Sequence, residues 1–141
     1  METQKELNIL LVEDDDGQAL LIEETLKKHL VIKKIYRQKD GEEAVFFVRQ
    51  QAPVPDLILL DIKIPKIDGH GVLQNLKNDK RFRSIPVIII SSTSDQREIN
   101  YCYQMGITGY ITKPVSYEEL GLKIKGLGAF LNVCTLPEGH L

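Results

Sequence analysis

Residues 56–61 read Asp-Leu-Ile-Leu-Leu-Asp, a run of four aliphatic residues between two aspartates. An unbroken apolar run of this length suits a strand that is covered on both of its faces, as strands in parallel sheets are. Residues 86–91, Pro-Val-Ile-Ile-Ile-Ser, repeat the same pattern. The two segments together predict a parallel β-sheet that has helices on both sides.

Three more segments rich in aliphatic and β-branched residues are predicted to be strands, and segments with helical spacing of apolar residues separate all five. The other predicted strands are 7–12, 31–37 and 109–112. The predicted helices are about 15–30, 41–51, 69–79, 94–106 and 116–131. In the last of these, Ser116 precedes Glu119 by three residues, which is the spacing of a capping box. Five alternations of strand and helix with short links are typical of a doubly wound α/β fold.

The length and composition are those of one ordinary globular domain. The chain has 141 residues, of which 43% are hydrophobic and 27% charged. We expect a single domain over residues 1–141, with a core at about 7–131 and a C-terminal tail at 132–141. The net charge of −2 does not favour binding to nucleic acid.

Nothing in the sequence favours a membrane or an oxidising compartment. No apolar run reaches the roughly 18 residues that a membrane-spanning helix needs, and the first residues, Met-Glu-Thr-Gln-Lys-Glu, do not read as a signal peptide. Cys102 and Cys134 lack the spacing of metal ligands, and Cys102 is predicted to be a packed helix residue. The histidines are scattered, and His70 is predicted to be a surface residue. We expect a cytoplasmic protein.

Polar residues follow four of the predicted strands at the point where each strand ends. Glu13 and Asp14 follow the first strand, Asp61 ends the third, Ser91 ends the fourth and Lys113 follows the fifth. In an open α/β sheet the carboxyl ends of the strands meet at one edge, where ligands bind. Any one of these residues alone would more often be a solvated strand end. Together they predict a site.

The chemistry of this set is narrow. Clustered carboxylates raise one another's pKa unless a cation lies among them, and oxygen ligands without histidine or thiolate favour Mg²⁺. A carboxylate beside such an ion can act as a nucleophile toward phosphorus. Lys113 and Ser91 are suitable donors to phosphoryl oxygens. The neighbouring Asp15 and Asp16 are instead predicted to begin a helix, where negative charge is favourable.

Four motifs in this order resemble the receiver domain of two-component response regulators. They are Leu-Leu-Val-Glu-Asp-Asp at 10–15, the segment 56–69, the segment 85–94 and Gly-Tyr-Ile-Thr-Lys-Pro at 109–114. The resemblance extends over about residues 7–131. It implies a flavodoxin-like (βα)₅ fold with strand order 2-1-3-4-5. It also implies a single-domain response regulator that catalyses only its own phosphorylation and dephosphorylation and is otherwise not an enzyme.

The resemblance assigns roles to the acidic residues. Asp61 would accept a phosphoryl group from a sensor histidine kinase. Glu13, Asp14, Asp61 and the backbone carbonyl of Lys63 would hold Mg²⁺, directly or through water. Receivers often have aspartate at the position of Glu13, but a carboxylate is retained.

The remaining implied roles concern the switch. Lys113 would pair with the phosphoryl group, or with Asp61 in its absence. Ser91, where threonine is more common, would donate to a phosphoryl oxygen, and Tyr110 would be the aromatic switch. The resemblance further implies a cis peptide bond between Lys113 and Pro114.

A narrower resemblance concerns the last part of the chain. Residues 113–120 and 130–137 are similar to stand-alone receivers that serve phytochrome-type histidine kinases. This resemblance implies such a kinase as partner and a homodimer formed through the C-terminal region. No output domain is expected after Leu131.

Two other functions remain open. A pseudo-receiver would have the same fold without phosphorylation, although the complete set of site residues argues against it. An aspartate-dependent phosphohydrolase would need a second acid two residues after Asp61, where this chain has Lys63.

Overall fold

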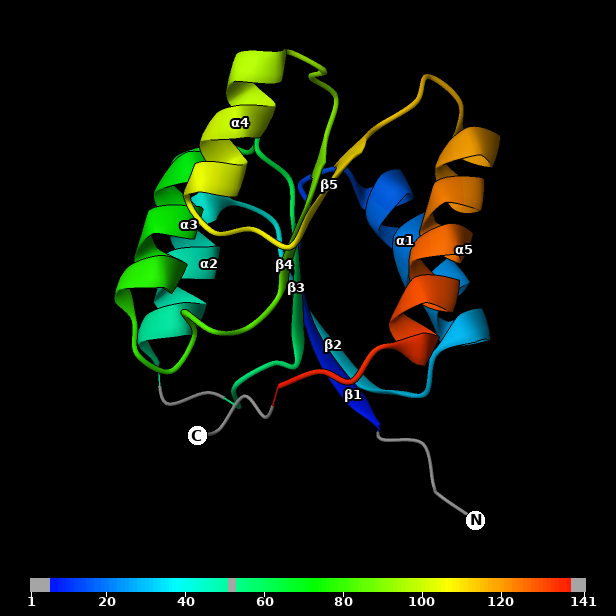
Figure 1. Cartoon of the computed structure of the whole chain (residues 1–141), viewed down its shortest axis with the longest axis horizontal. Helices are drawn as coiled ribbons and strands as arrows, with labels where there is room; N and C mark the ends of the chain where they lie inside the picture. Colours follow the sequence, from blue (N-terminus) through cyan, green and yellow to red (C-terminus); the bar gives the residue numbers. More distant parts are fainter. Residues whose placement is uncertain (1–5, 51–52, 138–141) are drawn as a thin grey trace.

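The computed structural model describes residues 6–50 and 53–137, in which a five-stranded parallel sheet lies between two layers of helices (Figure 1). The strands are β1 (Leu7–Val12), β2 (Ile32–Gln38), β3 (Leu57–Leu60), β4 (Val87–Ser91) and β5 (Gly109–Thr112). The helices are α1 (Asp16–His29), α2 (Gly41–Arg49), α3 (Gly69–Asn78), α4 (Gln96–Gln104) and α5 (Tyr117–Val133). The strand order β2-β1-β3-β4-β5 confirms the predicted flavodoxin-like topology.

Two hydrophobic cores lie on opposite faces of the sheet. Side chains alternate along β3, so that Leu57 and Leu59 face α1 and α5, whereas Ile58 and Leu60 face α2, α3 and α4. Figure 1 shows these two helical layers on either side of the sheet. Because both faces of the central strands are covered, their sequences are apolar without alternation.

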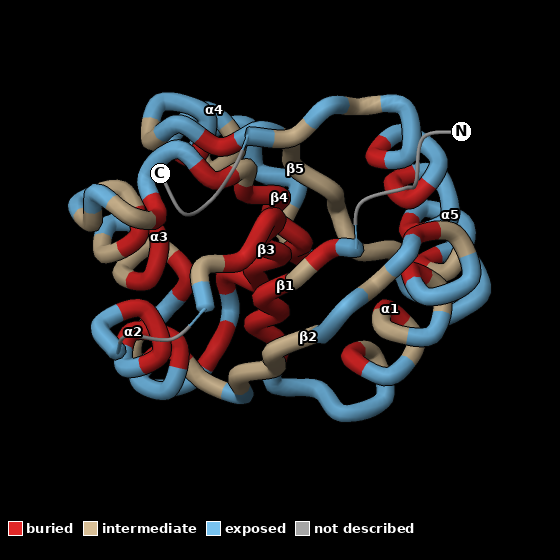
Figure 2. The backbone as a smooth tube through the Cα atoms, turned by 90° about the horizontal axis from the view of Figure 1, so that it is seen from below, coloured by how far each residue is buried: buried red, intermediate tan, exposed pale blue. Residues whose placement is uncertain are grey.

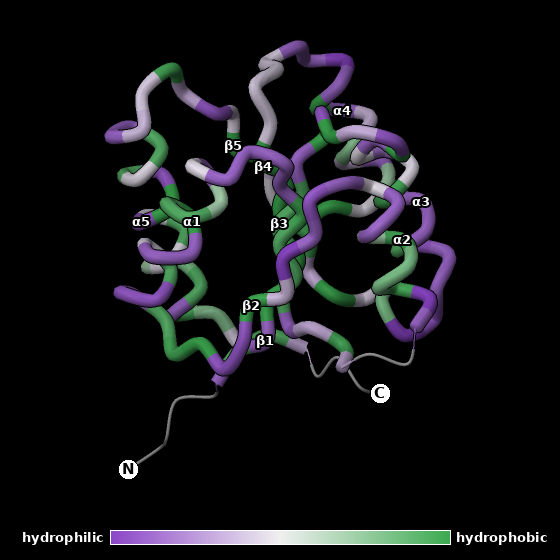
Figure 3. Tube along the Cα trace, turned by 180° about the vertical axis from the view of Figure 1, so that it is seen from behind, coloured by the Kyte–Doolittle hydropathy of each residue, from purple (hydrophilic) through white to green (hydrophobic). Residues whose placement is uncertain are grey.

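Burial decreases from the centre of the sheet to its edges (Figure 2). Every residue of β3 and β4 is buried, whereas no residue of β2 or β5 is. The hydropathy of the chain follows the same gradient, with apolar central strands and mostly polar outer helix faces (Figure 3). The central strands therefore hold the polar residues at their ends in fixed positions.

Every helix begins at a side chain that caps it. The N-caps are Asp15, Asp40, Asp68, Asp95 and Ser116. The Oγ of Ser116 accepts from the backbone N–H of Glu119 at 3.1 Å, as the capping-box spacing predicts. Asp15 accepts from the N–H of Gln18 at 2.8 Å, and α1 begins at Asp16, as expected from these two acids.

The predicted helix ends differ from those in the structure by one or two residues. Helix α2 ends at Arg49, because Gln50 has an extended backbone with ψ of 160°. Gln51, the last residue of the predicted helix, lies outside the described residues. Helix α5 runs two residues beyond the predicted end, to Val133. In the described part of the chain, no helix is long and apolar enough to cross a membrane.

The two-faced core leads to a stability prediction. Leu59 is fully buried in β3, whereas Leu122 on α5 is 63% exposed. Leu59→Ala should lower the free energy of unfolding by about 2–5 kcal/mol, because it removes buried methyl groups and leaves a cavity. The same change at Leu122 should alter it by less than about 0.5 kcal/mol. Urea denaturation measures both, and equal effects would contradict the packing described.

Candidate functional site

The parallel ladder places Glu13 and Asp61 side by side. Val12 pairs with Leu60 in the β1–β3 register, and the N–H of Asp61 donates to the carbonyl of Val12 at 3.0 Å. Glu13 is anchored to the neighbouring strand, because its N–H donates to the carbonyl of Gln38 at 3.1 Å. The two residues thus continue the ladder by one position beyond the strands. Their side chains are buried, with 1% of Glu13 and 5% of Asp61 exposed.

Lys113 lies between these two carboxylates. Its Nζ is 2.7 Å from Oε1 of Glu13, 2.8 Å from Oδ2 of Asp61 and 2.6 Å from Oε1 of Gln18. An ammonium group has three protons, so each can be donated to one of these acceptors. The backbone N–H of Lys113 donates to the carbonyl of Ser91 at 2.6 Å, which ties the lysine to the end of β4. The ammonium group is therefore satisfied and tightly positioned.

Burial changes the protonation of Glu13 and Lys113. Burial raises the pKa of Glu13 from 4.5 to about 7, and the charge of Asp61 adds to this, although the hydrogen bond from Lys113 opposes it. Burial alone would lower the pKa of Lys113, but its hydrogen bonds to Asp61 and Glu13 raise it overall. The site therefore holds its ammonium charge and resists a second negative charge.

Three carboxylates at this edge form a set that fits a divalent cation. Oxygen atoms of Glu13, Asp14 and Asp61 lie within 4.8 Å of one another, and Asp14 is exposed. A set made only of oxygen donors suits a hard divalent ion, whose charge would also relieve the repulsion between these acids. Lys63 contributes its backbone N–H, which donates to Oδ1 of Asp61 at 3.1 Å.

Ser91 and Tyr110 are linked through the loop that follows β4. The hydroxyl of Ser91 is buried and accepts from the N–H of Thr93 at 3.3 Å. The hydroxyl of Tyr110 donates to the carbonyl of Thr93 at 2.9 Å. Tyr110 is half-buried against the core formed with α2, α3 and α4. Thr93 thus contacts both residues that the resemblance assigns to the switch.

The expected cis bond between Lys113 and Pro114 is wrong. Among the described residues every peptide bond is trans. The lysine is positioned instead by the pairing of β5 with β4, in which Thr112 lies opposite Ser91, and by the three acceptors of its ammonium group.

Three residues that support the site were not predicted. Gln18 accepts from Lys113, and the guanidinium of Arg37 donates to the carbonyl of Glu13 at 3.0 and 3.2 Å. Arg37 also pairs with Asp16 at 2.8 Å, and its hydrogen bond lowers the pKa of that carboxyl.

The third residue is Gly69, at the start of α3. A Cβ on Gly69 would lie 2.7 Å from the carbonyl oxygen of Asp61, so only glycine allows α3 to start this close to β3. Such long-range contacts leave no periodic signal in the sequence.

The chain is similar in sequence and in structure to known proteins. The response regulator receiver domain family matches residues 9–125. The response regulator Rcp1 of Synechocystis sp. is 33% identical over 135 residues, which cover 92% of this chain and 92% of Rcp1. The Mn²⁺-bound crystal structure of Rcp1 matches with a TM-score of 0.88 and 31% identity, over 94% of this chain and 99% of Rcp1.

Two further crystal structures resemble this chain. The phosphorylated cyanobacterial phytochrome response regulator RcpA has a TM-score of 0.89 and 36% identity, over 95% of this chain and 100% of RcpA. The receiver domain of the sensor histidine kinase PA1611 of Pseudomonas aeruginosa, with a magnesium ion in its active-site cleft, has a TM-score of 0.66 and 27% identity, over 89% and 99% of the two chains. The family match, the strand order and the strand-end site agree: this chain belongs to the response regulator receiver domain family.

Proposed function

We propose that this receiver accepts a phosphoryl group on Asp61 from a phosphohistidine of a sensor histidine kinase. The observation that carries the proposal is the buried Asp61 carboxylate held at 2.8 Å from Lys113. In the transfer, an oxygen of Asp61 forms a bond to phosphorus while the bond between phosphorus and the histidine nitrogen breaks. The kinase imidazole leaves with the electron pair, and Asp61 becomes an aspartyl phosphate.

Mg²⁺ is the proposed cofactor, and Glu13, Asp14, Asp61 and the carbonyl of Lys63 are its proposed ligands. When bound, the ion neutralises charge on the phosphoryl oxygens. The oxygen-only donors and the relatives that hold Mn²⁺ or Mg²⁺ support this assignment. Lys113 supplies a second positive charge, because it already contacts Asp61 and needs only a small movement to reach a phosphoryl oxygen.

The switch that we propose runs through Ser91, Thr93 and Tyr110. A phosphoryl group on Asp61 offers Ser91 a strong acceptor and draws its hydroxyl toward it. The N–H of Thr93 then loses its present acceptor, and the carbonyl that binds Tyr110 moves with the loop. Phosphorylation would thereby shift the population of conformations at the face formed by α4, β5 and α5.

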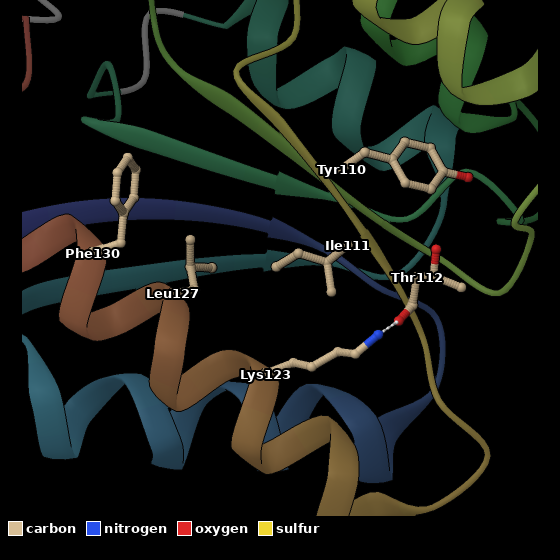
Figure 4. A pocket seen from close by; sticks show the side chains of 6 residues that line it. All are labelled: Tyr110, Ile111, Thr112, Lys123, Leu127 and Phe130. Carbon is tan, nitrogen blue, oxygen red and sulfur yellow. Dashed lines mark hydrogen bonds between the residues drawn. The ribbon is translucent and has the colours of Figure 1, made fainter. Parts of the chain in front are cut away.

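This face has features of a partner-binding surface. A cavity of about 510 Å³ opens between β5 and α5, lined by Tyr110, Ile111, Thr112, Lys123, Leu127 and Phe130 (Figure 4). Lys123 donates to the carbonyl of Thr112 at 2.7 Å within it. Tyr103 and Tyr117, on the flanking helices, are 47% and 54% exposed. We propose this surface as the contact that changes with phosphorylation.

We propose two finer assignments, one supported by a relative and one by exposed residues of α5. A phytochrome-type kinase is the proposed partner, supported by the likeness to RcpA, described as a phytochrome response regulator. A homodimer through the C-terminal region is proposed because Phe130 and Val133 on α5 are 55% and 82% exposed. We further propose a single cytoplasmic domain over residues 1–141 that binds no nucleic acid.

The residues near Asp61 do not suit an enzyme that hydrolyses other phosphorylated substrates. Lys63, two residues after Asp61, offers an ammonium group where a phosphohydrolase needs an acid, so we propose no hydrolase activity. A pseudo-receiver would lack phosphoryl acceptance, but here the acids, the lysine and the hydroxyl at the strand ends are all present.

Phosphoryl acceptance can be measured directly. The protein should gain the mass of one phosphate on incubation with a small phosphodonor and Mg²⁺, and chelation of Mg²⁺ should abolish the gain. Asp61→Asn should also abolish it, because an amide oxygen is a poor nucleophile. Asp15→Asn is the matched control, since it removes the same charge near the site while asparagine still caps α1. Intact mass spectrometry reports each result.

Two outcomes would contradict the proposal. An undiminished gain in Asp61→Asn would place the phosphoryl group elsewhere. No gain in the wild type, in protein shown to bind Mg²⁺, would identify a pseudo-receiver.

The protonation of Glu13 predicts a pH dependence of stability. The pKa of Glu13 is about 7 in the folded protein, whereas its ordinary value, as in an unfolded chain, is 4.5. Between these pH values the folded state therefore binds more protons than the unfolded state. The free energy of unfolding in a metal-free, chelating buffer should therefore fall as pH rises from about 4.5 through 7. Glu13→Gln should flatten this dependence, and Glu24→Gln, at an exposed position of α1, should leave it unchanged. Urea denaturation at a series of pH values tests this, and an unchanged slope in Glu13→Gln would contradict it.

A further inference from the structure

A second cluster of side chains that can bind a metal lies between α3 and α4. His70 is in the first turn of α3, and Glu98 and Cys102 are one helical turn apart on α4. The Nε2 of His70 contacts Oε1 of Glu98, and ligand atoms of His70, Glu98 and Cys102 all lie within 4.8 Å of one another. His70 was predicted to be a surface residue and Cys102 a packed helix residue, so the fold alone reveals the cluster.

The chemistry of this cluster differs from that of the acidic site. It combines an imidazole nitrogen, a thiol sulfur and a carboxylate oxygen, which suit Zn²⁺ and similar transition metals rather than Mg²⁺. Three protein ligands leave a fourth tetrahedral position for water, as in many zinc sites. The two sites would therefore prefer different cations, because the sulfur and nitrogen ligands of this cluster are softer than the oxygen ligands of the acidic site.

We propose that His70, Glu98 and Cys102 bind a Zn²⁺-class transition metal ion that joins the start of α3 to α4.

The burial of the three residues suits such a site. The side chains of His70 and Glu98 are 28% and 24% exposed, which gives an ion access from solvent, whereas Cys102 is fully buried behind them. The ring of Tyr101 packs edge-on against His70 with centroids 5.0 Å apart, which limits the rotation of the imidazole.

Without a bound metal ion, Cys102 is a protonated thiol that packs in the core. Burial, and then the charge of Glu98, raises its pKa to about 11, so the thiol keeps its proton at neutral pH. Coordination breaks the S–H bond, forms a sulfur–metal bond and releases the proton to solvent. The sulfur and the carboxylate of Glu98 then share one positive ion instead of opposing each other.

Metal binding would restrain the helix that the proposed switch moves. Cys102 belongs to the core against which Tyr110 packs, so an ion fixing α4 to α3 would oppose rearrangement of that core. This regulatory consequence rests on the proposed function, whereas the metal site does not.

Co²⁺ is a suitable probe, because its thiolate complexes have a charge-transfer absorption that oxygen-only sites lack. Titration of the purified protein, in excess Mg²⁺ to occupy the acidic strand ends, should produce this absorption with a stoichiometry of one ion per chain, and Zn²⁺ should then remove it. Cys102→Ala should abolish the absorption. Cys134→Ala, at the end of α5, is the matched control and should retain it.

His70 and Glu98 are only partly buried, so His70→Gln and Glu98→Gln test the site without leaving a cavity in the core. Each should weaken Co²⁺ binding more than about tenfold, since loss of even an outer-shell partner of a ligand costs that much. Asp61→Asn should bind Co²⁺ like the wild type, which keeps this result independent of phosphoryl acceptance. No absorption in the wild type, or an absorption that survives in Cys102→Ala, would overturn the proposal.

Discussion

The contact of one buried ammonium group with two buried carboxylates is the constraint on which the site depends. Ionised groups are costly to bury unless they are paired and hydrogen-bonded. Lys113 meets this condition only because β1, β3, β5 and α1 bring Glu13, Asp61 and Gln18 to its three protons. The adjacency of β1 and β3 therefore serves the charges as well as the core, because a strand order that separated these two strands would leave the groups unpaired.

Much of this arrangement follows from the sequence. The aliphatic runs predict β3 and β4, and in a parallel sheet the acids after β1 and β3 must then share an edge. The positions of Glu13 and Asp61 follow from that topology, and the register of Val12 with Leu60 bears it out. Gln18 could not be predicted in the same way, because its contact with Lys113 depends on how α1 leaves the sheet. The peptide geometry before Pro114 was expected by family resemblance and was wrong for this chain.

The cluster between α3 and α4 was even harder to predict from the sequence than the contact of Gln18 with Lys113. His70 and Cys102 have no metal-ligand spacing along the chain, and only the packing of two helices on one face of the sheet brings them together. One face of the molecule thus holds a soft-ligand cluster, while the strand ends hold a hard-ligand cluster. Tyr110 lies between the two, bonded to the loop after Ser91 and packed on the core that contains Cys102.

The buried Asp61 carboxylate beside Lys113 is the proposed acceptor of the phosphoryl group. Borohydride reduces an aspartyl phosphate to homoserine, so reduction of the phosphorylated protein followed by peptide sequencing in a mass spectrometer locates the modified residue. We expect homoserine at position 61, because that carboxylate is buried, contacts the ammonium group and belongs to the cation-binding set, whereas burial raises the pKa of Glu13, the other buried acid of the set, to about 7. Aspartate left intact at 61, with homoserine at position 14 or with 2-amino-5-hydroxypentanoic acid, the reduction product of a glutamyl phosphate, at position 13, would contradict it.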